Sequence, residues 1–212
     1  MKDIPVFTTE NGAASLILRE IPYQQSAYII LRDTREPEKL TAECRDFCVA
    51  CGAERVYATG HSVLERGDFH TAIQRMTCPA AALADTDAAL WPVGEQTLAF
   101  WRQIYNEKVA KVPNGAWMTL EDGREMLKNG DGYFVHRGET LLGIGRASGD
   151  TIDYVAAVQP GAGRDVVLAL AHALTEETLT LTVASTNRKA VGLYESLGFV
   201  TTAELSRWYR LR

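Results

Sequence analysis

Two polar side chains near the end of the chain have the spacing of neighbours on one helix face. Asn187 and Tyr194 lie seven residues apart, in a segment that follows the alternating stretch 179–183 and ends at Gly198. Seven residues are two helical turns, which places both side chains within roughly 20° of one face and about 10 Å apart along the axis. A phenol with a pKa near ~10 is protonated at neutral pH and can donate its proton. We therefore expect a helix that can contact a long, thin ligand at two points.

A turn of small residues is the second candidate for ligand binding. Between an expected strand and an expected helix the chain reads Val158-Gln159-Pro160-Gly161-Ala162-Gly163-Arg164-Asp165-Val166-Val167-Leu168. Backbone N–H groups at the start of a helix can hold an anion, and small residues let it approach closely. Arg164 adds a positive charge, whereas Asp165 adds a negative one, although an acid in the first turn of a helix is structurally ordinary.

Three cysteines have the spacing of an iron–sulfur motif, Cys44-x3-Cys48-x2-Cys51. Thiolates that hold a cluster need a loop that wraps around it. These three instead fall on one stripe of an expected helix, together with Leu40 and Phe47. We therefore expect buried thiols and no metal site.

The elements that must position these residues follow from turn signals and apolar spacing. The first half predicts a hairpin around Asn11-Gly12, then strand, helix and two strands, with ranges 6–9, 14–18, 27–31, 37–51, 54–59 and 69–76. Segment 80–94 reads as a connector, which gives domains 1–95 and 96–212. The second half predicts helices at 98–112, 120–129, 164–175 and 187–197 and strands at 133–136, 140–144, 152–158, 179–183 and from Phe199 on. This order predicts an α/β protein with a mixed sheet.

The late helix resembles the closing motif of the GNAT superfamily of N-acetyltransferases. The shared pattern is an asparagine, an alanine three residues later, then Leu-Tyr-Glu and Leu-Gly-Phe, as in Asn187-Arg188-Lys189-Ala190-Val191-Gly192-Leu193-Tyr194-Glu195-Ser196-Leu197-Gly198-Phe199. The layout of residues 96–212 fits the same family. The resemblance implies an acetyl-CoA donor, a sheet splayed between the fourth and fifth strands, and direct transfer of acetyl to an amine. It also implies that Asn187 contacts the pantetheine arm and that Tyr194 protonates the leaving thiolate.

The resemblance further implies a cofactor site along the turn, made by Ala157, Val158, Gly161, Gly163, Arg164 and Val166 together with Asn187. The turn departs from the family pattern, because the basic-or-glutamine position falls on Gly163 and the two later glycines fall on Val166 and Leu168. We expect the Val166 side chain to crowd the phosphates.

The acceptor amine must lose a proton, since an alkylammonium has a pKa near ~10. Asp153, at the start of the strand beside the expected splay, is the candidate base by position, ahead of Glu121 and His136. Three aromatic residues could line the acceptor pocket, although aromatics at helical spacing are more often core: Trp101, Tyr105 and Trp117.

The first half echoes the second at an offset of 126 residues. Residues 28–60 fall over 154–186 without a gap, strand on strand and helix on helix, with apolar pairs such as Leu40 over Val166. Any two βαβ units match to some degree, so the identities alone are no better than chance. We interpret residues 1–95 as a truncated, non-catalytic copy that lacks the two helices beginning the second half.

Composition limits the class of protein further. The chain has 212 residues, 46% of them hydrophobic and 23% charged, and a formal net charge of −5. An acidic chain has no overall field for nucleic acid or an anionic membrane, and no stretch has the ~20 apolar residues of a membrane span. The start shows no apolar secretion segment, so the cytoplasm is the expected location.

The function expected from these observations is transfer of acetyl from acetyl-CoA to an amine, either a small molecule or a peptide. The alternative is a non-catalytic binding or interaction protein that keeps the fold but has weakened or lost the acetyl-CoA site, as the altered turn suggests. The acceptor and the oligomeric state stay open.

Overall fold

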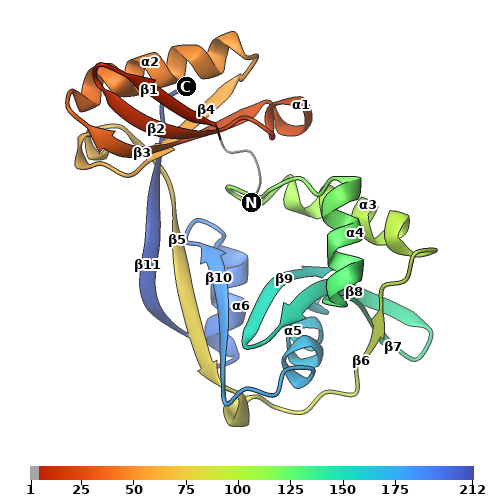
Figure 1. The fold of residues 1–212 in the computed structure, drawn as a ribbon. Coiled ribbons are helices and arrows are strands. Elements are labelled where there is room, and N and C mark those ends of the chain that lie inside the picture. The colour runs from red at the N-terminus through yellow and green to blue at the C-terminus, as the bar shows by residue number, and fades with distance from the viewer. Residues whose placement is uncertain (1–4) are drawn as a thin grey trace. The chain divides into compact units, whose positions relative to one another are not determined.

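The computed structural model describes residues 5–212 and divides them into two compact units. Unit 1 holds the chain up to Ile73 and the terminal segment Leu205–Arg212, and unit 2 holds Gln74–Glu204. Two long strands, β5 (Asp68–Pro79) and β11 (Val200–Arg210), belong partly to each unit (Figure 1). The units therefore divide the chain at a different place from residue 95, where the composition changes.

Unit 1 is a sheet with one long helix. Its elements are β1 (Val6–Thr9), β2 (Gly12–Ile17), α1 (Ile21–Gln24), β3 (Ser26–Thr34), α2 (Pro37–Ala50), β4 (Arg55–Thr59) and the 3-10 helix η1 (Ser62–Arg66). The strand order is β1-β2-β3-β4, with the end of β11 beside β4. The hairpin expected at Asn11-Gly12 is confirmed, and Gly12 has φ +142°. Strands β3 and β4 are parallel and joined through α2.

Unit 2 is a mixed sheet with four helices. Its elements are the 3-10 helix η2 (Ala80–Ala82), β6 (Ala89–Pro92), α3 (Leu98–Val109), α4 (Leu120–Asn129), β7 (Gly132–Arg137), β8 (Thr140–Ser148), β9 (Thr151–Ala157), α5 (Gly163–His172), β10 (Thr178–Ala184) and α6 (Arg188–Ser196). The strand order is β11-β5-β10-β9-β8-β7-β6. The α/β class with a mixed sheet is confirmed. No helix among residues 5–212 is long and apolar enough to cross a membrane.

Local signals explain where the helices begin and end. Thr119 accepts a hydrogen bond from the Asp122 N–H, and the Asp122 carboxylate accepts one from the Thr119 N–H, which closes the start of α4. Gly130 ends that helix in the left-handed region, with φ +68°. Two glycines of β8 let α5 pack directly on the sheet, because a Cβ on Gly143 or Gly145 would lie under 3 Å from side-chain atoms of α5.

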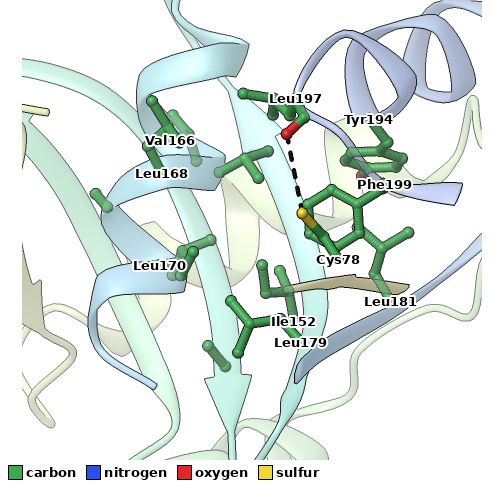
Figure 2. Close-up of a cluster of buried hydrophobic side chains, with 14 of the residues drawn as sticks. Cys78, Ile152, Val166, Leu168, Leu170, Leu179, Leu181, Tyr194, Leu197 and Phe199 are labelled. Atoms are coloured by element: carbon green, nitrogen blue, oxygen red, sulfur yellow. Dashed lines mark hydrogen bonds between the residues drawn. The ribbon is translucent and has the colours of Figure 1, made fainter. Parts of the chain in front are cut away.

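Strand β9 has an apolar core on each of its faces. On one side Ile152 belongs to the cluster that packs α5 and α6 (Figure 2). Val155 and Ala157 pack against the same cluster. On the other side Tyr154 and Ala156 join the cluster under α3 and α4. The two faces of β9 therefore connect the late helices with the early ones.

The segment between the expected domains contributes more than a connector would. Residues 89–92 form β6, an edge strand paired with β7, which the irregular sequence of this segment did not reveal. Earlier still, Met76 and Cys78 of β5 are fully buried in the core beneath α5 and α6. The core of unit 2 thus includes residues that come before position 95.

The cysteines of α2 are partly as expected. Cys44 and Cys48 are free thiols with no exposed surface, and burial raises the pKa of Cys44 to about 11 and of Cys48 to about 12. Cys51, expected to be buried with them, is exposed, because it is the C-cap residue that follows the last turn of α2.

Candidate functional site

Strands β9 and β10 run parallel but are paired only at their beginnings. The register joins Thr151 to Thr180 and Ile152 to Leu181, and no later pair follows among the described residues. The Thr180 N–H also donates to the Asp150 carbonyl at 2.8 Å, a hydrogen bond that joins the beginnings of the two strands. Figure 1 shows the two strands separating beyond this point. The sheet therefore opens between β9 and β10, the third and fourth strands after residue 95.

The open side of β9 presents backbone groups. The Val158 N–H donates to the Leu142 carbonyl of β8 at 2.9 Å, so alternate residues of this antiparallel ladder also bond toward β8. The intervening residues, Val155 and Ala157, direct their N–H and C=O groups to the opposite side, where β10 has separated. Ala157 is thus placed to offer its backbone to a ligand, whereas the Val158 N–H is used within the sheet.

The start of α5 is uncapped. No side chain accepts from its first turn, and the N–H groups of Gly163, Arg164 and Asp165 precede the first intrahelical bond, from the Val166 N–H to the Ala162 carbonyl at 3.0 Å. Gly161 has φ +82°, a conformation suited to glycine, and a Cβ there would meet open space. Arg164 is exposed and makes no ion pair with any residue from 5 to 212. These groups form a candidate anion site.

The expectation that Val166 crowds the phosphates is wrong. Its side chain has no exposed surface and lies in the core beneath α5, where a Cβ added to Gly143 would come within 2.6 Å of it. Leu168 is buried in the same cluster. Valine and leucine fit at these two positions because their side chains are buried in the core beneath α5. The Val166 N–H, however, is occupied within the helix and is not free for a ligand.

Asp165 is turned to a cation on the neighbouring sheet. Its Oδ1 lies 3.1 Å from Nη2 of Arg137, the last residue of β7, and accepts a hydrogen bond from Thr86 at 3.5 Å. The negative charge expected beside an anion at α5 is therefore paired.

Asn187 caps α6. Its Oδ1 accepts from the Ala190 N–H at 3.3 Å, and its Nδ2 donates to no described residue. The cap and ligand roles considered for Asn187 are compatible, since they use different atoms of the side-chain amide.

Tyr194 lies on α6 in the core, with its ring 6.1 Å from that of Phe199 (Figure 2). Burial raises the pKa of Tyr194 to about 12. The Tyr194 hydroxyl makes no hydrogen bond with the described residues. It is nevertheless not one of their fully buried polar atoms that lack a hydrogen-bond partner. It also raises the pKa of Tyr154 on β9, after the larger effects of burial and Tyr105. The phenol is thus protonated at neutral pH.

Asp153 lies at a bulge of β9. The register passes from Ile152, opposite Ala147, to Tyr154, opposite Arg146, and leaves Asp153 without a partner in β8. Partial desolvation raises the pKa of its exposed carboxyl, whereas the nearby Arg146 guanidinium lowers it.

Arg146 is itself held by Asp131, with Nη2 2.5 Å and Nε 3.3 Å from the two carboxylate oxygens. Asp131 is buried, so this ion pair is a fixed part of the surroundings of Asp153.

The remaining candidates are less suited to chemistry. Glu121 is exposed in the first turn of α4, and the His136 ring contacts the Gly138 carbonyl at 3.0 Å. Trp101 has no exposed surface and donates to the Tyr133 carbonyl, so it belongs to the core. Tyr105 and Trp117 are half-buried.

Sequence reasoning missed two arginines beside the predicted residues. Arg137 had only the appearance of a turn residue, and Arg146 lies in a strand with no motif around it. The sequence did contain one signal. Side chains alternate between the two faces of a strand, and this alternation places Arg137 and Arg146 at positions that do not belong to the apolar core.

The fold is shared with solved structures at low sequence identity. A conserved protein of unknown function from Staphylococcus epidermidis is 14% identical, with a TM-score of 0.65 over 98% of this chain and 93% of that one. A putative acetyltransferase from Pyrococcus horikoshii is 13% identical, with a TM-score of 0.58 over 99% and 70%. A tandem GNAT protein from the clavulanic acid biosynthesis pathway is 11% identical, with a TM-score of 0.50 over 94% and 78%.

No protein-family model and no curated protein matches the sequence. The structural likeness shows that the chain has the GNAT acyltransferase fold, which confirms the fold implied by the closing motif.

Proposed function

We propose that the protein is an N-acetyltransferase that moves acetyl from acetyl-CoA directly to an amine. The observation that carries this proposal is the separation of β9 from β10 after two residue pairs, next to the uncapped start of α5. Unpaired strand edges and free helix amides are hydrogen-bonding groups that need a partner. A long polar ligand that carries amide groups and a diphosphate supplies partners for both.

The groups present fit acetyl-CoA. The N–H groups of Gly163 and Arg164 and the Arg164 guanidinium suit the diphosphate, with Gly161 allowing close approach. The free backbone of Ala157 and the Nδ2 of Asn187 suit the amides of the pantetheine arm. Val166 contributes through packing beneath α5, since its N–H is engaged.

When bound, acetyl-CoA supplies the thioester that is exchanged for an amide. Two protons must move, one from the ammonium before it attacks and one to the departing sulfur. Tyr194 holds its proton across the physiological pH range and can donate it to a thiolate, whose free pKa is near ~8.5. Asp153, at the bulge of β9, is the candidate acceptor for the other proton, directly or through water.

We propose that unit 1 is a degenerate copy that binds no acyl donor. Its β3-α2-β4 segment repeats the β9-α5-β10 connection, and η1 follows β4 where α6 follows β10. His61 caps η1 by accepting from the Val63 N–H at 3.1 Å, as Asn187 caps α6. η1 has five residues and α6 has nine, so the turn that carries the tyrosine is missing.

Isothermal calorimetry with acetyl-CoA tests the proposal. We expect saturable binding with a Kd below 1 mM, which corresponds to about −4.1 kcal/mol. Substituting Asn187 by alanine should weaken that binding, and substituting Asn11, a buried asparagine of unit 1, serves as the matched control. Absence of binding to the wild-type protein at millimolar acetyl-CoA would contradict the proposal and favour a non-catalytic protein that keeps the fold.

A further inference from the structure

Two helices of unit 2 carry an aspartate at the third position of the first turn, and the two carboxylates behave differently. In α4, Asp122 accepts from the Thr119 N–H at 2.9 Å and closes the start of the helix. In α5, Asp165 has the same position, but no side chain caps the helix. In α5 the N–H of the N-cap residue, Ala162, instead donates to the Gln159 carbonyl at 3.3 Å. The next three N–H groups, of Gly163, Arg164 and Asp165, have no partner among residues 5–212.

Arg137 accounts for this difference. Its Nη2 lies 3.1 Å from Asp165 Oδ1, and its Nε and Nη2 each lie 2.7 Å from Asp87 Oδ1. Thr86 adds a hydrogen bond to the same oxygen of Asp165. The Arg137 guanidinium, at the end of β7, thus forms ion pairs with both Asp87, which precedes β6, and Asp165 of α5.

The charge of Asp165 should affect a phosphate bound at the start of α5 more than the charge of Asp87 does. The Asp165 side chain is 27% exposed, whereas that of Asp87 is 72% exposed and well screened by water. An unpaired carboxylate in the first turn of α5 would repel a phosphate bound to the N–H groups of that turn.

We propose that Arg137 is a positioning residue for the acyl donor, because it neutralises the Asp165 carboxylate in the first turn of α5. This inference rests on the proposed function. It explains how the chain keeps an aspartate in a phosphate-binding turn. The two residues act as a pair, so loss of Arg137 is harmful only while Asp165 is present.

A double-mutant cycle with acetyl-CoA as the probe tests the pair. Calorimetry on the full-length protein should show that Arg137→Gln weakens binding by roughly three- to tenfold, as expected for an unmatched charge at a helix start. Asp165→Asn alone should change the affinity less than twofold, and the double variant should return to that level. The loss in Arg137→Gln should shrink at high salt.

The control is Arg66→Gln, which removes an exposed pair with Glu38 in unit 1 and should leave the affinity unchanged. Melting curves of all variants separate binding from folding. Wild-type affinity in Arg137→Gln, or failure of Asp165→Asn to restore it, overturns the inference and leaves the proposed function intact. Absence of binding to the wild-type protein overturns both, so the two failures are distinct.

Discussion

The two parallel βαβ segments of the chain differ in how completely their strands are joined. In unit 1, β3 and β4 pair over five positions, from Ser26 opposite Arg55 to Ile30 opposite Thr59. In unit 2, β9 and β10 pair over two and then separate. Closed pairing satisfies the strand backbones internally, whereas open pairing leaves them for a ligand. The same supersecondary unit is thus structural in one place and suited to binding in the other.

The helices between these strands differ in the same direction. Helix α2 begins with Pro37, which has no N–H, and is flanked by Glu36 and Glu38. Helix α5 begins with Gly163 and Arg164 and has no side-chain cap. An anion is favoured at the second helix start and disfavoured at the first.

The proposed duplication can be compared with the observed strand faces of the two units. The faces of β3 match those of β9 at the offset of 126. Tyr28 lies on the face of β3 away from α2, and Tyr154 lies on the face of β9 away from α5. Strand β4 matches β10 only when one residue is omitted. Val56 and Leu181 both lie in the core beside the helices, and they are 125 positions apart instead of 126 (181 − 56 = 125). The echo is therefore not gapless.

Removing residues 1–95 should have the largest effect. The remaining segment lacks β5, and with it Met76 and Cys78, which are fully buried beneath α5 and α6. We expect no cooperative thermal transition by circular dichroism, because the core of unit 2 loses a central strand. A well-folded 96–212 fragment would show that the second half is an independent domain.

Shortening one core leucine in each helix should separate stability from binding. Leu40 of α2 and Leu170 of α5 have no exposed surface, so Leu40→Ala and Leu170→Ala should each cost about 2–5 kcal/mol of unfolding free energy. Only Leu170→Ala should also weaken acetyl-CoA binding, since it loosens the helix that offers the N–H groups. Denaturant unfolding and calorimetry measure the two effects. Equal effects on binding would remove the distinction between the two segments.

Replacing the phenol on α6 should affect turnover more than binding. Tyr194→Phe keeps the ring against Phe199 and removes the proton donor, so we expect turnover to fall about 100-fold with acetyl-CoA affinity preserved. The assay is thiol release with an amine that the wild-type protein acetylates. Because the pKa of Tyr194 is raised to about 12, its proton should stay in place up to about pH 10. Unchanged turnover would reject the acid role.

Alkaline pH should weaken unit 1 through its buried thiols. The pKa of Cys48 is raised from 9.0 to about 12, so the folded state keeps a proton that the unfolded state loses above pH 9. The contribution to stability is complete below that pH and is lost as pH rises toward 12. At pH 10 the loss is on the order of 1 kcal/mol. Cys48→Ala should flatten the dependence in denaturant unfolding, and an unaltered slope would contradict this assignment.

Local structure could be predicted from the sequence because its signals are local. Thr119 and Asp122 mark a helix start, and Asn11-Gly12 marks a hairpin, through hydrogen bonds and dihedral angles within a few residues. Strand pairing could not be predicted in this way. The alternation in 179–183 shows that one face is buried, but the separation from β9 depends on residues far along the chain.

The positions of the candidate residues in the fold were predicted in part for the same reason. Asn187 and Tyr194 were selected from the closing motif and their helical spacing, and Asn187 caps α6 while Tyr194 lies within it. The direction of the Val166 side chain was not predicted, because the space that it occupies is left by Gly143 of β8, which is distant in the sequence. Arg137 was missed since its partner, Asp165, lies 28 residues further along the chain (165 − 137 = 28).

Amide hydrogen exchange followed by NMR, with and without acetyl-CoA, tests the contrast between the two segments most directly. The account predicts that the ligand slows exchange at Gly163, Arg164 and Ala157, and that amides at the start of α2, such as Glu38, are unaffected. Absence of protection at α5 and β9, or equal protection at α2, would contradict the claim that only the open strand pair receives the acyl donor.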